Sequence, residues 1–290
     1  MGPSLTSFIA SNYALLQPTL VTIPGGTFTM GAGTDYGAHQ ASISTFQMGR
    51  TQVTNDEYAR YLASLGDRRY ALVGTNLATR TLGVIALGPS EDQIRSAVDL
   101  EVVRAADSLM TSGLYVLGYV MKKILDSFDV INIKDKKSRA EFDSPRQPVI
   151  NVDWFEAAVY AFLHGAMLPT ESQWEYAARV VQGREGLRKY ATPSGELTHE
   201  EAHFGAESTI DVDDPRYPTL ENGLRHMTGN VWEWVDPVGS LNGDLRSLRG
   251  GAWFFTYVNE LRANHRQHED PFNYTETIGF RVAAPAESDR

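Results

Sequence analysis

Three short strings rich in glycine and aromatic residues decide the fold of this chain: GNVWEW at Gly229–Trp234, LRGGAWF at Leu248–Phe254 and IGFRVA at Ile278–Ala283. Trp232 and Trp234 stand two positions apart, so a strand places both indoles on one face and Glu233 on the other. Aromatic area dominates the energetics of protein cores, and we therefore expect both indoles to be buried. The same expectation covers the other tryptophans, Trp154, Trp174 and Trp253.

Working outward, capping boxes predict three short helices, because an N-cap residue is followed three positions later by Glu or Gln. The pairs are Thr54 with Glu57, Asp153 with Glu156, and Thr170 with Gln173. Gly66 and Gly165 stand where the first two helices are expected to end. Nearer the N-terminus, LVTIPGGTFTM at Leu20–Met30 alternates apolar and small residues around PGG, which predicts a β-hairpin.

The composition is that of a folded chain without thiol chemistry. Of 290 residues, 42% are hydrophobic and 21% charged, which is far from the signature of disorder. A net charge of −10 gives no overall field attractive to phosphate backbones, so we expect no nucleic-acid partner. Zero cysteines exclude disulfides, zinc–thiolate sites, iron–sulfur clusters and thiol nucleophiles.

Neither a secretory signal nor a membrane span is expected. The first basic residue is Arg50, so the charged region that begins a secretory signal is missing. The longest apolar stretch, Leu109–Leu125, contains Lys122 and Lys123 and is too short to cross a bilayer. A cytoplasmic location is the default expectation, and surface display by another route is left open.

Seven strings, in order, resemble one family: IPGGTFTMG at Ile23–Gly31, TQVTNDEYARYL at Thr51–Leu62, PVINVDWFEAAVYAF at Pro148–Phe162, LPTESQWEYAAR at Leu168–Arg179, and the three strings quoted first. Together they are similar to the formylglycine-generating-enzyme (sulfatase-modifying factor) domain. The resemblance implies a C-type-lectin-like α+β fold, loop-rich, with small antiparallel sheets and flanking helices.

The resemblance covers about residues 20–65 and 146–284 and implies a single domain over residues 1–290 with an α/β insertion at about 66–145. Within the insertion, TLGVIALG predicts a strand, Glu91–Met110 an amphipathic helix and Leu109–Leu125 a buried helix. The helices are expected to form a packing layer, and self-association into an oligomer through them is left open.

The enzymology of that family does not carry over to this chain. The resemblance implies copper held by two cysteines, and Phe255 and Glu260 are the residues nearest those positions here. Neither supplies a soft sulfur ligand, so formylglycine generation is excluded and a non-enzymatic protein is predicted. Sulfoxide synthases that share the domain place iron on histidines of a separate helical bundle, for which the seven histidines of this chain give no match.

No cofactor is expected. HEEAH at His199–His203 matches the zinc motif H-E-x-x-H, but Gly and Pro residues flank it, which favours a solvated turn over a long helix. The resemblance implies structural calcium near GNVWEW. Asn230 and Glu233 match its ligands, but His203 and His226 stand where the family has asparagines, and His is a poor ligand for a hard cation.

The segment between GGAW and IGFR mixes aromatics with short hydrogen-bonding side chains, as binding surfaces do. We predict a variable region at about residues 250–282 whose ligand-binding residues are Phe254, Phe255, Thr256, Tyr257, Val258, Asn259, Asn264, His265, His268, Asp270, Phe272, Asn273, Tyr274 and Thr275.

This segment also resembles the variable region of the target proteins of diversity-generating retroelements. In those systems the adenines of template Asn codons are randomised, which gives Phe, Tyr, His, Asp, Asn, Thr and Val but excludes Glu, Gln, Lys, Met and Trp. Residues 254–259, 264–265 and 272–275 are all ones that a randomised Asn codon can encode. Such a codon cannot encode Glu260, Gln267, Glu269 or Glu276, which are therefore assigned to the scaffold.

The resemblance therefore implies a receptor-like protein that binds a protein or surface ligand. Two alternatives are kept. The first is an enzyme of the same fold with an altered active site, which requires a convergent acid–base cluster beside Trp253. The second is a protein-interaction module without diversification, docking through the insertion.

Overall fold

The computed structural model describes residues 19–31, 37–67, 69–75, 82–90, 92–93, 129–134, 139–181, 183, 186–236, 245–255 and 257–286. Its strands are β1 (Leu20–Ile23), β2 (Gly26–Met30), β3 (His39–Ile43), β4 (Phe46–Gly49), β5 (Tyr70–Thr75), β6 (Leu82–Gly88), β7 (Asp129–Asn132), β8 (Trp232–Val235), β9 (Arg246–Arg249), β10 (Gln267–Glu269), β11 (Ile278–Phe280) and β12 (Ala283–Pro285). Its helices are α2 (Asn55–Leu65), a 3₁₀ helix at Ala140–Phe142, α5 (Trp154–Leu163) and α6 (Glu171–Arg179).

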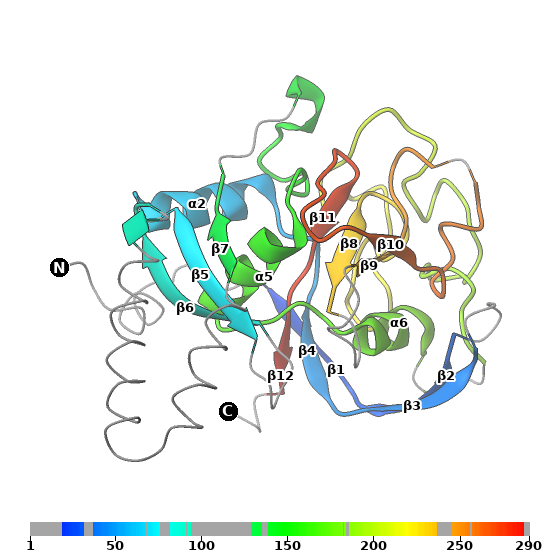
Figure 1. The fold of residues 1–290 in the computed structure, drawn as a ribbon. Helices are drawn as coiled ribbons and strands as arrows, with labels where there is room; N and C mark the ends of the chain where they lie inside the picture. Colours follow the sequence, from blue (N-terminus) through cyan, green and yellow to red (C-terminus); the bar gives the residue numbers. More distant parts are fainter. Residues whose placement is uncertain are drawn as a thin grey trace, which may run out of the picture.

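The strands form small separate sheets with the orders β1-β4-β12, β10-β9-β8-β11, β2-β3 and β6-β5-β7. Only the β8–β11 pair is parallel among the described strands. The β10-β9-β8-β11 sheet and α6 lie on one side of the molecule, and α2, α5 and the β6-β5-β7 sheet lie on the other (Figure 1). Long irregular loops join these elements, so the predicted loop-rich α+β class is confirmed.

The three predicted helices are confirmed, with all three capping boxes closed on both sides. In α2, the Thr54 hydroxyl accepts from the Glu57 backbone N–H at 3.2 Å, and the Glu57 carboxylate accepts from the Thr54 N–H at 2.8 Å. Each box satisfies two backbone donors that a helix start leaves unbonded. Helix formation is therefore decided locally.

The predicted hairpin over Leu20–Met30 is wrong. β1 pairs with β4 and β2 pairs with β3, so the turn PGG bends a two-stranded ribbon instead of reversing it. The returning strand crosses that bend closely: a Cβ on Gly25 would lie 2.5 Å from the Ile43 carbonyl oxygen, and the Gly25 N–H donates to the Thr45 hydroxyl. The chain instead reverses between β2 and β3. Both halves of the expected hairpin then have a partner, because β1 pairs with β4 and β2 pairs with β3.

All five tryptophans are buried, as the sequence predicts. Trp154, Trp232 and Trp234 pack with Tyr58, Tyr160 and Phe280 in one core between α2, α5 and the β8–β11 pair. A second core gathers around Trp174, Phe46 and Met48, and a smaller one around Trp253 and Phe142.

A buried ion pair lies between the first core and the second, which contains Trp174. Glu233, on β8, and Arg281, just after β11, are both 0% exposed. The Glu233 carboxylate accepts from Arg281 Nε at 2.6 Å and Nη2 at 2.7 Å, from Trp174 Nε1 at 2.7 Å and from Gln52 Nε2 at 2.9 Å. Arg281 also donates to the carbonyl oxygens of residues 49 and 225. The sequence predicts that Glu233 faces away from Trp232 and Trp234 on the strand, but it does not predict that the Glu233 carboxylate is buried.

Part of the proposed insertion forms the sheet β6-β5-β7, and the strand expected at TLGVIALG is confirmed as β6. This sheet lies against α5 (Figure 1). The helices expected at Glu91–Met110 and Leu109–Leu125 fall outside the described residues, apart from residues 92 and 93. Within the described ranges, no helix is long and apolar enough to span a membrane.

Replacing Arg281 by Met should lower the free energy of unfolding by about 3–5 kcal/mol, because the buried Glu233 charge loses its compensating partner. Urea denaturation measures the loss. The control is Arg60→Met, since the Arg60 and Asp56 side chains are 52% and 56% exposed and pair at 2.9 Å; an exposed pair of this kind contributes about 0–1 kcal/mol. Equal losses in the two variants would contradict the assignment.

Candidate ligand-binding surface

The segment of residues 254–275 connects β9 to β11 of the β10-β9-β8-β11 sheet, and it contains β10, which pairs with β9. It follows β9 through Gly250 and Gly251, whose φ angles of 96° and 73° favour glycine. A Cβ on Gly251 would lie 2.5 Å from the Leu261 side chain, so the turn also needs glycine for space. Trp253 anchors the start, because its backbone N–H donates to Asn230 O and its indole N–H to Glu276 O.

Buried anchors recur inside the segment. Leu261 and Ala263 are 0% exposed, and the Ala263 N–H donates to Lys189 O at 2.9 Å. Further on, the Pro271 carbonyl accepts from the first N–H of α5, and Arg266 Nη1 lies 3.2 Å from the Glu171 carboxylate. The backbone of this irregular segment is thus held at several points along its length.

Between these anchors the predicted residues turn outward. The exposed aromatic and apolar side chains are Phe254 at 62%, Tyr257 at 74%, Val258 at 48%, Phe272 at 55% and Tyr274 at 50%. The exposed polar ones are Asn259, His268, Asp270 and Asn273, and Thr275 is half-buried. Among the residues whose side-chain exposure the structure describes, which excludes strands β5, β6 and β7, Leu245 is the one other large apolar side chain with this exposure. Within that part of the chain, exposed apolar surface is therefore concentrated in this segment.

Three of the predicted ligand-binding residues are less exposed than the rest, and one lies outside the described residues. Asn264, predicted to bind ligand, is buried, with a fractional exposure of 8%. Phe255 and His265 are half-buried, with ring centroids 5.6 and 5.9 Å from that of Trp232. Burial, aided by Arg249, lowers the pKa of His265. Thr256 lies outside the described residues.

Two residues from the end of the insertion border this surface, and sequence reasoning missed both. Lys134 Nζ lies 5.6 Å from the centre of the Tyr274 ring, a cation–π distance. Arg139 pairs with Glu276 through two hydrogen bonds of 3.0 and 2.8 Å. Arg139 and Glu276 are separated by 137 positions in sequence, so no local pattern could have associated them.

The positions nearest the family's copper-binding cysteines do not fit copper. Phe255 packs edge-on against Trp232, and Glu260 offers only carboxylate oxygen. Burial raises the pKa of Glu260. No thiolate exists in the chain to hold a soft metal ion.

The residues at the implied calcium position are engaged otherwise. His203 contacts Tyr217 and the Ser208 carbonyl, and the Asn230 amide is bonded to Ile210. Burial, followed by the charge of Arg225, lowers the pKa of His226 to about 3. Because Glu233 is already neutralised by Arg281, this donor set does not suit a hard dication.

The HEEAH string forms a turn, as predicted, in which Ala202 and Glu201 N–H groups donate back to Thr198 O. His199 stacks on Phe204, with ring centroids 4.1 Å apart, and no helix carries the string. The residues that the structure describes contain no group of three or more His, Asp or Glu side chains placed to hold a metal ion.

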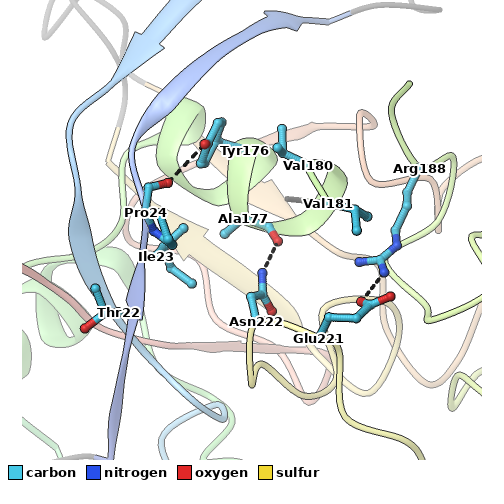
Figure 2. A pocket seen from close by; sticks show the side chains of 10 residues that line it. All are labelled: Thr22, Ile23, Pro24, Tyr176, Ala177, Val180, Val181, Arg188, Glu221 and Asn222. Atoms are coloured by element: carbon cyan, nitrogen blue, oxygen red, sulfur yellow. Dashed lines mark hydrogen bonds and ion pairs between the residues drawn. The ribbon is translucent and has the colours of Figure 1, made fainter. Parts of the chain in front are cut away.

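Figure 2 shows a separate pocket of about 470 Å³ between β1 and α6, on which apolar side chains from both elements converge. Its polar groups largely bond one another: Arg188 pairs with Glu221, and Asn222 Nδ2 donates to Ala177 O at 2.8 Å. None of the residues predicted to bind ligand lines it.

Comparison with known proteins agrees with this architecture. Residues 8–286 match the family model described as the sulfatase-modifying factor enzyme 1-like domain. The formylglycine-generating enzyme of Streptomyces coelicolor is 30% identical, over 92% of this chain and 89% of the relative.

Solved structures share the fold. PvdO from Pseudomonas aeruginosa superposes with a TM-score of 0.58 at 19% identity, over 93% of this chain and 95% of the other. Treponema denticola variable protein 1 superposes with a TM-score of 0.56 at 16% identity, over 92% and 95%. Both similarities extend over nearly the whole chain, as does the family match. The fold is thus the C-type-lectin-like fold of the formylglycine-generating-enzyme type, and the chain belongs to the sulfatase-modifying factor enzyme 1-like family.

Proposed function

We propose that this chain is a non-enzymatic, receptor-like protein that binds a protein or surface ligand through residues 254–275, and that it is the target protein of a diversity-generating retroelement. One observation carries the proposal. Among the residues whose side-chain exposure is described, which leaves out strands β5, β6 and β7, five of the six exposed large apolar side chains lie in this segment, on a backbone held by buried anchors. Exposed aromatics of this kind supply large contact area at low entropic cost when a ligand binds.

The pattern of exposure supports diversification. Among the residues that the adenine rule excludes, Glu276 has structural partners: its carboxylate pairs with Arg139 and its carbonyl oxygen accepts from the Trp253 indole. Positions whose residues a randomised Asn codon can encode, such as 257, 258 and 273, face solvent. The fold is also that of Treponema denticola variable protein 1. The net charge of −10 supports a ligand other than nucleic acid.

Sequencing the locus tests diversification. We expect a near-copy of the stretch encoding residues 250–282, with adenines at the codons for 254–259, 265 and 272–275, and a reverse-transcriptase gene nearby. A near-copy identical at those codons, or no copy, would contradict diversification.

A diversifiable surface must tolerate substitution without loss of stability. We expect the triple variant Phe254→Asn, Tyr257→Asn, Tyr274→Asn to keep its free energy of unfolding within about 1.5 kcal/mol of the parent, because exposed substitutions cost about 0.5 kcal/mol each. The control is Leu261→Ala, in the same segment but fully buried, which should cost about 2–5 kcal/mol. Urea denaturation compares them. A triple variant as unstable as the control would count against the proposal.

We further propose that the chain holds neither copper nor structural calcium, which separates it from an enzyme of the same fold with an altered active site. Treatment with EDTA should leave the melting temperature unchanged, and elemental analysis should find both metals far below one equivalent. A cysteine-containing sulfatase peptide should stay unoxidised. Stoichiometric copper with conversion of that peptide would favour the enzyme.

A further inference from the structure

A second pocket, of about 670 Å³, lies where the end of β4 meets the start of α2 and the loops before β8. Four arginines line it: Arg50, Arg60, Arg146 and Arg225. In a chain with a net charge of −10, such a gathering of cations is unexpected. None of the residues assigned to the ligand-binding surface belongs to it.

The three carboxylates in this pocket already have partners. Asp56 pairs with Arg60 at 2.9 Å, and Asp213 accepts from Arg146 Nε at 2.8 Å. Glu57 closes the capping box of α2 by accepting from the backbone and hydroxyl of Thr54. The pocket's acidic groups therefore leave two of its four arginines uncompensated.

Those two are Arg50 and Arg225. The Arg50 guanidinium is exposed and has no hydrogen-bond or ion-pair partner among the described residues. Arg225 Nη2 donates to the carbonyl oxygens of Asp214 and Tyr217, each at 2.6 Å, and its buried Nε has no hydrogen-bond partner among the described residues. Burial, and then the neighbouring charge of Arg50, lower the pKa of Arg225.

The backbones that carry these two side chains are rigidly joined. The Arg225 N–H donates to Arg50 O at 2.9 Å. Arg281, fixed by Glu233, donates to Arg225 O at 2.9 Å and to Gly49 O at 2.9 Å. The fold therefore keeps the two cations close enough for the charge of Arg50 to act on Arg225, and an anion between them would relieve this repulsion.

We propose that this pocket binds the phosphate group of a small phosphate monoester, with Arg50 and Arg225 as its two cationic contacts. A dianion neutralises both guanidinium groups, whereas one carboxylate neutralises only one, and guanidinium forks match phosphate oxygens. The volume exceeds what a phosphate ion alone fills, and this leaves room for an organic body. Threonine hydroxyls in the lining, such as that of Thr51, add hydrogen-bond donors.

Titration calorimetry with phenyl phosphate and with inorganic phosphate, at the ionic strength of a potassium chloride reference, tests the site. Both should bind, phenyl phosphate more tightly. Arg50→Ala should raise Kd by about tenfold or more, since it removes a charge-assisted contact. Asp213→Asn should lower Kd, because it frees Arg146. The control Arg139→Ala, at an exposed arginine outside the pocket, should leave Kd unchanged.

Arg50 is exposed, so Arg50→Ala should keep the parent melting temperature in chloride, which separates lost binding from lost folding. The proposal is overturned if phosphate stabilises the chain no more than chloride does, or if Arg50→Ala binds phenyl phosphate as the parent does. Phenyl phosphate binding no tighter than inorganic phosphate would overturn the assignment to an ester.

Discussion

The Glu233–Arg281 ion pair is the interaction on which the rest of this structure depends. Burying two charges is unfavourable unless both are fully hydrogen-bonded, and here the carboxylate accepts from the guanidinium, an indole and an amide. The donors come from the segment before α2, from α6 and from the chain after β11. Because Arg281 also binds the carbonyl oxygens of residues 49 and 225, one buried pair fixes four distant segments together.

Both proposed binding sites rest on this frame. The segment 254–275 is attached at each end to strands of the sheet that contains Glu233, and its internal anchors point into the cores. The arginine pocket uses the backbone that Arg281 holds. A rigid base lowers the entropic cost of binding, since the interacting groups are already in place.

The chain keeps the scaffold of its family while lacking the family's thiol ligands. Fold and function separate readily, because packing depends on tryptophans, capping boxes and the buried ion pair, whereas chemistry depends on a few side chains in a loop. Here Phe255, one of the two residues nearest those loop positions, packs against Trp232. An aromatic side chain there adds contact area beside the proposed binding surface.

The sequence by itself determined the three helices, the burial of the tryptophans and the exclusion of thiol chemistry. Capping boxes involve residues three positions apart, and burial of an indole follows from its size, so neither needs knowledge of distant partners. It also located a segment whose aromatics, apart from Phe255, are exposed. Only the tertiary structure decided that β1 pairs with β4, that Asn264 is buried and that Lys134 lies beside Tyr274. It likewise brought Arg50 to Arg225 and neutralised Glu233 with Arg281. These outcomes depend on contacts between residues far apart in sequence, which local patterns do not encode.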